Sequence, residues 1–130
     1  MEKNYKSKLF KIKTFIFDVD GVLTDGKVIV TTEGEMYRAL DTKDGYAMKY
    51  AMIKGFKIAI ISGGTNEGIR NRFQALGVKD IYLGAHEKSA AYDELVNNYK
   101  LKPDEILYIG DDIPDIPLIK KVGVSCCPSD

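Results

Sequence analysis

The stretch TFIFDVDG, residues 14–21, decides the fold class of this chain. It begins with a short apolar, aromatic and β-branched run over residues 14–17, which is typical of a buried β-strand. Two aspartates, Asp18 and Asp20, follow at once, and Gly21 permits a turn there. The stretch therefore predicts a buried strand that ends in a turn carrying acidic side chains.

The order of strand and helix repeats along the rest of the chain. Apolar runs predict further strands at residues 57–61, 80–84, 105–109 and 122–125, and apolar side chains recur at helical spacing between them. This alternation predicts an α/β fold, a three-layer α/β/α sandwich on a mainly parallel Rossmann-like sheet, in one domain over residues 1–130. The predicted helical faces consist of Ala47, Tyr50, Ala51 and Lys54; of Ile69, Phe73 and Leu76; and of Tyr92, Leu95, Val96 and Tyr99.

Residues 26–40 interrupt this alternation. Two β-rich runs, at residues 27–32 and 35–40, flank Glu33 and Gly34, and this pattern predicts a β-hairpin. Its position directly after the first strand places it over the carboxyl end of the sheet, where open α/β sheets bind ligands. The hairpin is either a structural edge or a flap that packs against another subunit and keeps water out of a site.

The composition argues against nucleic-acid and membrane partners. Lys+Arg and Asp+Glu number 19 each, and 45% of the residues are apolar, as in ordinary globular proteins. The apolar runs are too short to span a membrane, and residues 1–13 lack the apolar core of a signal peptide. The only cysteines, Cys126 and Cys127, are adjacent, which favours a reduced, cytoplasmic protein in which they fill apolar space near the last strand.

Polar side chains follow four of the predicted strands. Because the carboxyl ends of parallel strands share one edge of a sheet, we expect these residues to converge although they lie far apart in the chain. Each has an ordinary explanation as a turn, a loop, a solvated lysine or a helix N-cap, but their joint occurrence at strand ends favours a functional site. In chain order they are Asp18, Asp20, Ser62, Gly63, Lys88, Asp111, Asp112 and Asp115.

This set of side chains suits phosphoryl transfer. A carboxylate such as Asp18 attacks phosphorus and forms an aspartyl-phosphate. Asp20 points to the opposite side if the strand continues, but if the chain turns at Gly21 it swings back and protonates the leaving oxygen. Nucleophile and phosphate are both anionic, so a cation is needed, and Mg²⁺ held by Asp18 and Asp111 meets that need. The predicted donors to the phosphate oxygens are Lys88, the Ser62 hydroxyl and the Gly63 amide.

The chain resembles the haloacid dehalogenase (HAD) superfamily at these motifs. The resemblance rests on DVDGVLTDG at residues 18–26, ISGG at residues 61–64, Lys88, and GDDIPD at residues 110–115. It implies a HAD-like phosphatase fold without a large cap domain.

The same resemblance implies roles for the aspartates. Asp18 is the expected nucleophile and Asp20 the expected general acid and base. Mg²⁺ is expected on Asp18, the main-chain carbonyl of Asp20, and Asp111. Asp112 and Asp115 are expected to shape the surroundings of the metal and of Lys88.

A narrower resemblance is to capless phosphatases that act on 3-deoxy-D-manno-octulosonate 8-phosphate (KDO 8-phosphate). It is carried by DVDGVLTDG, the hairpin, and ALDTKDGYAMK at residues 39–49, and it implies a cytoplasmic homotetramer in lipopolysaccharide biosynthesis, with a neighbouring subunit closing each site. Many such enzymes carry Arg in place of Gly64. Relatives acting on nine-carbon sialic-acid-type 9-phosphates resemble a pattern with Glu at that position and Lys near Ala75, and this chain has neither. The small residues here favour the eight-carbon substrate. The implied substrate-binding residues are Asp20, Asp41, Thr42, Lys43, Asp44, Gly45, Lys49, Gly63, Arg72 and Lys88, although Lys49 and Arg72 also fit a solvated helix surface.

Other functions stay open at this point. They are a phosphatase of nine-carbon 9-phosphates, a phosphatase of other sugar phosphates, and a non-catalytic phospho-receiver or regulatory domain. A receiver places its acidic pair after the first strand and its phosphorylated aspartate after the third, an order that this chain does not follow.

Overall fold

A five-stranded parallel sheet forms the centre of the computed structural model, which describes residues 5–110 and 112–128. The strand order is β5-β4-β1-β6-β7, with β1 in the middle. The strands are β1 (Thr14–Phe17), β4 (Lys57–Ile61), β5 (Asp80–Tyr82), β6 (Ile106–Ile109) and β7 (Val124–Cys126). The described helices are α1 (Tyr5–Leu9), α2 (Thr42–Ile53), α3 (Glu67–Leu76), α4 (Lys88–Tyr99) and α5 (Ile116–Ile119), with 3-10 turns η1 (Pro103–Glu105) and η2 (Ile113–Asp115).

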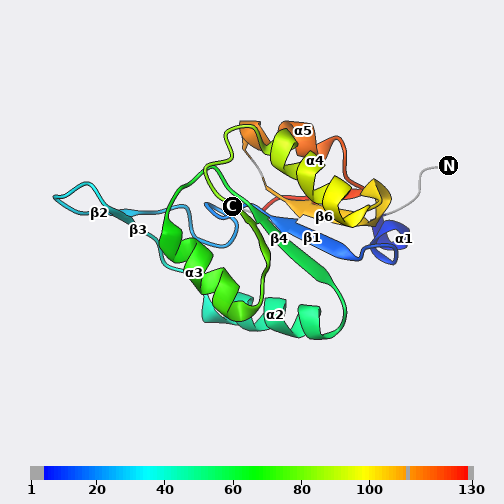
Figure 1. Cartoon of the computed structure of the whole chain (residues 1–130), viewed down its shortest axis with the longest axis horizontal. Coiled ribbons are helices and arrows are strands. Elements are labelled where there is room, and N and C mark those ends of the chain that lie inside the picture. Colours follow the sequence, from blue (N-terminus) through cyan, green and yellow to red (C-terminus); the bar gives the residue numbers. More distant parts are fainter. Residues whose placement is uncertain (1–4, 111, 129–130) are drawn as a thin grey trace.

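Helices cover both faces of the sheet, which confirms the predicted three-layer α/β/α fold. α2 and α3 lie on one face, and α4 and α5 lie on the other (Figure 1). Side chains of β4 alternate between the two layers: Ile58 and Ile60 pack with α2 and α3, while Ala59 and Ile61 pack with α4 and α5. The two layers pack on opposite faces of the central strands. The residues that follow these strands are therefore held at one common edge of the sheet.

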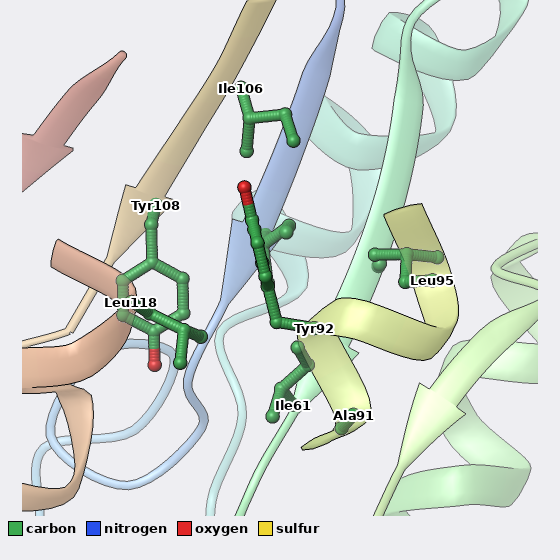
Figure 2. Packing of buried hydrophobic residues seen from close by; sticks show 9 residues of the cluster. Ile61, Ala91, Tyr92, Leu95, Ile106, Tyr108 and Leu118 are labelled. Carbon is green, nitrogen blue, oxygen red and sulfur yellow. The ribbon is translucent and has the colours of Figure 1, made fainter. Parts of the chain in front are cut away.

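The layer under α4 and α5 is the more enclosed of the two. Figure 2 shows the ring of Tyr92 among Ile61, Ile106 and Tyr108, with its hydroxyl pointing toward Ile106. Tyr92 is only 3% exposed, and among the described residues its hydroxyl has no hydrogen-bond partner. A buried, unpaired hydroxyl lowers the stability of this core.

Residues 26–40 leave the body of the molecule. They contain two short antiparallel strands, β2 (Ile29–Val30) and β3 (Met36–Tyr37), which project beyond the carboxyl edge of the sheet (Figure 1). Gly34 closes the turn with a φ of +83°. The side chains of Ile29 and Val30 are 70% and 63% exposed, so the hairpin presents apolar surface to solvent.

Two expectations about side-chain faces are wrong. α2 buries Gly45 and Met48, whereas Tyr50 is 53% exposed. A Cβ on Gly45 would lie 3.1 Å from Leu76 Cδ1 of α3. The lack of a side chain at Gly45 therefore lets this face of α2 pack closely against α3. Cys126 and Cys127 are exposed rather than apolar fillers, since Cys126 ends the edge strand β7 and Cys127 follows it.

The other helical faces match the prediction except at Tyr99, which is 41% exposed and donates a hydrogen bond from its hydroxyl to Asp80. Ile69 and Phe73 are buried, and Gly77 ends α3 with a φ of +104°. Tyr92 and Leu95 are buried on α4. In the part of the chain that the structure describes, no helix has the length and apolar character needed to cross a bilayer.

Candidate active site

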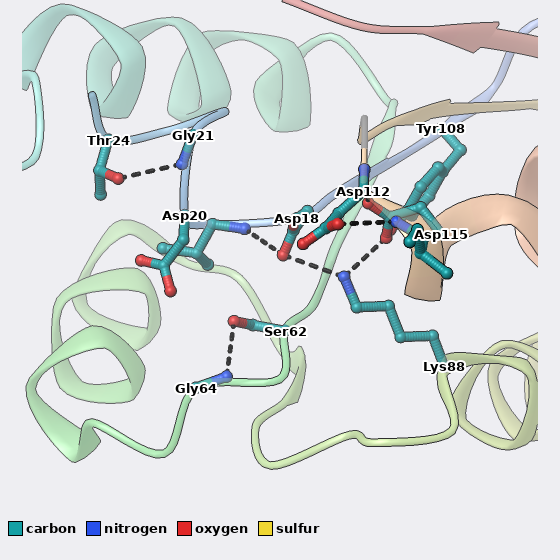
Figure 3. Close-up of polar contacts among 12 residues, drawn as sticks. Asp18, Asp20, Gly21, Thr24, Ser62, Gly64, Lys88, Tyr108, Asp112 and Asp115 are labelled. Atoms are coloured by element: carbon teal, nitrogen blue, oxygen red, sulfur yellow. Dashed lines mark hydrogen bonds and ion pairs between the residues drawn. The ribbon is translucent and has the colours of Figure 1, made fainter. Parts of the chain in front are cut away.

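The chain turns sharply after β1. Three successive amides, at residues 22–24, donate hydrogen bonds to the carbonyl oxygen of Val19, and Gly21 has a φ of +81°. Glycine adopts this left-handed conformation without the strain of a side chain. After this turn Asp18 and Asp20 line the same cavity, and the Asp20 carboxylate points away from that of Asp18 (Figure 3).

A buried chain of polar groups leads away from Asp18 (Figure 3). Lys88 Nζ lies 3.1 Å from Asp18 Oδ1 and donates to Asp115 Oδ1 at 2.6 Å. The Tyr108 hydroxyl donates to the same oxygen of Asp115. Lys88 is 4% exposed and Asp115 is fully buried, so the alternative of a solvated lysine at a helix start is wrong.

The negative charge of Asp18 is only partly balanced by the polar groups around it. Burial raises the pKa of Asp18, the positive charge of Lys88 and the Val19 amide oppose that rise, and the charge of Asp115 adds to it. Burial, and then the hydrogen bond to Asp115, raise the pKa of Tyr108, so its hydroxyl stays a neutral donor. Two carboxylates therefore share one ammonium group, and the site favours an additional cation.

Ser62 and Asp112 complete the rim of the site. Ser62 follows β4, is 3% exposed, and accepts a hydrogen bond from the Gly64 amide at 3.2 Å. The Asp112 side chain accepts from the Ile113 amide at 2.7 Å and caps η2, while the Asp112 amide donates to Asp115 Oδ2 at 3.1 Å. Capping therefore explains part of the role of Asp112 and positions Asp115.

One cavity of about 230 Å³ gathers most of the predicted catalytic residues. Asp111 was predicted as a metal ligand and lies outside the described residues, and Asp115 lies behind the cavity, bonded to Lys88. The cavity is lined by Asp18, Asp20, Ser62, Gly63, Gly64, Ala85, His86, Lys88, Asp112 and Pro114.

The residues predicted to bind the rest of the substrate lie elsewhere. Asp41, Asp44, Gly45 and Arg72 surround a separate small cavity that shares no lining residue with the one beside Asp18. The remaining three, Thr42, Lys43 and Lys49, are exposed on α2 and line neither cavity. Within one chain the structure does not bring these residues to the aspartates, and their role in substrate binding stays a prediction.

Arg38 is a residue of the site that the sequence analysis did not identify. It follows β3 and forms a two-point ion pair with Asp20, from Nε to Oδ1 at 2.6 Å and from Nη2 to Oδ2 at 3.3 Å. Its side chain is only 9% exposed. A single arginine at the end of a hairpin strand carries no local signal of such a contact.

The described donors fit a hard divalent cation. Among residues 5–110 and 112–128, no three His, Cys, Asp or Glu side chains form a group that holds a metal by itself. Both described contacts of the Asp18 carboxylate use Oδ1, and no hydrogen bond to Oδ2 is made within the described residues. A carboxylate beside a cavity with surplus negative charge is the kind of ligand that Mg²⁺ takes, with water and phosphate completing its shell.

The order of the strand-end aspartates, the parallel sheet and the buried lysine define a class of hydrolases. The chain belongs to the haloacid dehalogenase-like hydrolase family, whose sequence model matches residues 35–123. Within this family it is similar to the 3-deoxy-D-manno-octulosonate 8-phosphate phosphatase of Escherichia coli (strain K12). The two are 34% identical over 124 residues, which cover 95% of this chain and 66% of the E. coli protein, so this chain spans just under two thirds of that relative's length.

Solved structures show the same likeness. A HAD superfamily (subfamily III A) hydrolase from Legionella pneumophila superposes with a TM-score of 0.90 and 39% identity, covering 95% of this chain and 68% of that one. The 3-deoxy-D-manno-octulosonate 8-phosphate phosphatase of Moraxella catarrhalis, solved with magnesium, phosphate and KDO, gives a TM-score of 0.87 and 28% identity, covering 95% of this chain and 80% of that one.

Proposed function

We propose that this protein hydrolyses phosphate monoesters through an aspartyl-phosphate on Asp18, with KDO 8-phosphate as the substrate. The observation that carries the proposal is the contact between Lys88 Nζ and Asp18 Oδ1 at 3.1 Å. It holds one oxygen of the buried carboxylate and leaves the other to attack phosphorus. The likeness to KDO 8-phosphate phosphatases supports the choice of substrate.

The proposed reaction has two steps. In the first, Asp18 Oδ2 forms a bond to phosphorus while the bond to the leaving oxygen breaks, and Asp20 gives that oxygen a proton. In the second, Asp20 takes a proton from water as the water attacks phosphorus, which releases phosphate and restores the Asp18 carboxylate. Ser62 Oγ and the Gly63 amide bind the phosphate oxygens, while Lys88 holds the nucleophile.

Mg²⁺ is the proposed cofactor, supported by the magnesium in the Moraxella structure. Asp18, the main-chain carbonyl of Asp20, and Asp111 would hold it. When bound, it neutralises the repulsion between a carboxylate nucleophile and an anionic phosphate.

The surroundings of the reaction are also proposals. The exposed apolar hairpin supports self-association into a homotetramer in which a neighbouring subunit closes the site. A cytoplasmic location and a place in lipopolysaccharide biosynthesis follow from the likeness to KDO 8-phosphate phosphatases. Family membership leaves the receiver-domain alternative without support, whereas phosphatases of nine-carbon 9-phosphates or other sugar phosphates remain the competing functions.

The test is phosphate release from KDO 8-phosphate, a nine-carbon sialic-acid-type 9-phosphate, and glucose 6-phosphate, with Mg²⁺ and with chelator. We expect Mg²⁺-dependent turnover with a clear preference for KDO 8-phosphate, and no turnover by the Asp18→Asn variant. Turnover that survives in that variant contradicts the mechanism, and equal turnover of all three substrates contradicts the substrate. A raised KM on Lys49→Ala or Arg72→Ala, for KDO 8-phosphate only, would assign those residues to its carboxylate.

A further inference from the structure

Arg38 connects the hairpin to the candidate general acid. Two contacts hold the β3 end of the hairpin to the core. The Asn66 side chain donates to the Met36 carbonyl at 2.9 Å, and Arg38 pairs with Asp20. Only the second of these contacts reaches the candidate catalytic residues. The Arg38 side chain is 9% exposed, whereas that of Asp20 is 43% exposed, so the guanidinium is the more desolvated partner.

The two contacts within the pair are unequal. Nε lies 2.6 Å from Asp20 Oδ1, which is a short charge-assisted hydrogen bond, while Nη2 lies 3.3 Å from Oδ2. Two contacts from a planar guanidinium fix the plane of a carboxylate as well as its position. Asp20 is therefore firmly held at Oδ1 and more loosely held at Oδ2.

Oδ2 is also the Asp20 oxygen that lies beside Gly64 and Ser62. A Cβ placed on Gly64 would lie 3.7 Å from Asp20 Oδ2, 3.6 Å from Ser62 Oγ, and 3.5 Å from Arg38 Nη2. These three groups thus converge on the same point beside the Gly64 backbone. Asp20 Oδ2 therefore lies on the Ser62 side of its carboxylate, next to a group that the proposed function assigns to the phosphate.

We propose that Arg38 is a positioning residue for general acid catalysis by Asp20. Its Nε holds Oδ1 and directs Oδ2 toward the leaving oxygen. When Oδ2 carries the proton it no longer accepts from Nη2, but Oδ1 still accepts from Nε, so the orientation survives protonation. The inference rests on the proposed function, because it assigns Asp20 the role of acid.

Leaving groups that differ in their need for a proton test this role. p-Nitrophenolate departs without protonation at neutral pH, whereas phenolate from phenyl phosphate needs an acid, and the two substrates have nearly the same shape. We expect Arg38→Ala to lower kcat/KM for phenyl phosphate by about 10-fold or more, a share of the 10²–10⁴ typical of general acids, and for p-nitrophenyl phosphate by less than about 3-fold. Arg38→Lys, which keeps a single donor, should lie between wild type and Arg38→Ala.

A double-variant cycle connects the effect to Asp20. Asp20→Asn should show the same selective loss, and adding Arg38→Ala to it should cost little more for phenyl phosphate. The same cycle on KDO 8-phosphate gives a second reading if the aryl phosphates are poor substrates. Additive losses in both cycles would overturn the inference.

Asn66→Asp is the matched control. It removes the amide donor to the Met36 carbonyl and keeps the oxygen that accepts from the Gly68 amide at the start of α3. We expect it to leave the ratio of the two aryl rates unchanged.

Three outcomes contradict a positioning role. Equal losses on both aryl phosphates in Arg38→Ala would show a purely structural role, and a higher KM confined to KDO 8-phosphate would show direct contact with the sugar. A changed ratio in the Asn66→Asp control would assign the effect to hairpin anchoring. Failure of the proposed function is distinguishable, because Asp18→Asn would then still hydrolyse p-nitrophenyl phosphate.

Discussion

Lys88 connects the nucleophile to the interior of the protein. Its ammonium group contacts Asp18 and Asp115, and Asp115 accepts in turn from the hydroxyl of Tyr108. At the buried end of this series of polar groups the hydrogen-bonding groups have partners, whereas Asp18 at the other end faces the cavity. The buried groups behind Lys88 therefore position its charge beside Asp18. Small changes in these buried groups should alter both stability and activity.

Replacing Asp18 should stabilise the fold while abolishing activity. Burial raises the pKa of Asp18, so folding favours its protonated form, and that contribution to stability is lost as the pH rises through the folded pKa. At neutral pH the ionised group opposes folding, and Asp18→Asn should raise the free energy of unfolding by about 1 kcal/mol. Urea unfolding in chelator measures it. The difference between the two proteins should shrink as the pH falls through the folded pKa of Asp18, and a constant difference contradicts the explanation.

Gly110 shows how closely the backbone approaches this chain of polar groups. A Cβ there would lie 2.6 Å from Asp115 Oδ2 and 2.7 Å from Tyr108 Cε2, and both side chains are fully buried. Gly110→Ala should therefore displace Asp115, lower the free energy of unfolding by about 2 kcal/mol, and reduce kcat. Gly63→Ala is the control for stability, because a Cβ at Gly63 meets nothing within 4 Å. Equal stability of both variants in chemical unfolding would refute this reading.

At the scale of elements, α4 has two tasks. Its first residue, Lys88, enters the site, and its apolar face, with Tyr92 and Leu95, packs on β1, β4 and β6. The packing positions the lysine, because the helix cannot move toward the site without disturbing this core. Tyr92 contributes one unfavourable feature to that face, because its buried hydroxyl has no hydrogen-bond partner among the described residues.

Two tyrosines of the same core should respond oppositely to loss of the hydroxyl. Tyr92→Phe should raise the free energy of unfolding by about 1 kcal/mol, because it removes an unsatisfied buried polar group. Tyr108→Phe should lower it by about 2 kcal/mol, because the Tyr108 hydroxyl donates to the Asp115 carboxylate. Thermal or urea unfolding measures both. A destabilised Tyr92→Phe would mean that the hydroxyl has a partner in solution.

At the scale of the whole molecule, the hairpin is a segment whose apolar side chains do not pack against the core. Val28, Ile29, Val30, Met36 and Tyr37 are all at least 39% exposed, and they lie on a projection beyond the carboxyl edge of the sheet (Figure 1). An exposed apolar surface of this kind is typical of an interface. Self-association through it would also bring a second chain to the open cavity beside Asp18.

A charge on the hairpin should therefore change the oligomeric state. Ile29→Lys places an ammonium group within the apolar surface and should shift the protein from the proposed tetramer toward smaller species, while the free energy of unfolding within one chain changes by less than about 0.5 kcal/mol. Light scattering after size-exclusion chromatography measures it. Glu33→Lys, a charge change beside the turn, is the control and should remain tetrameric. An unchanged mass for Ile29→Lys would exclude the hairpin as the interface.

The sequence by itself determined the sheet and the placement of its chemistry. β1 and β4 have the predicted bounds, because short apolar runs stopped by acidic or glycine residues are local signals. Asp18, Ser62 and Lys88 meet at one edge because parallel strands end on the same side. The strands and the polar residues after them are local patterns, and the common edge follows from the parallel arrangement, which is why a single sequence predicts them.

Only the tertiary structure decided which partners these residues have. Arg38 meets Asp20 across 18 positions of sequence, and Lys88 meets Asp115 across 27. The buried face of α2 and the separate cavity at Arg72 likewise depend on how α2 packs against α3. Such contacts follow from the order of the strands and the close approach of helices, and these are set by the packing of the whole chain rather than by any local pattern.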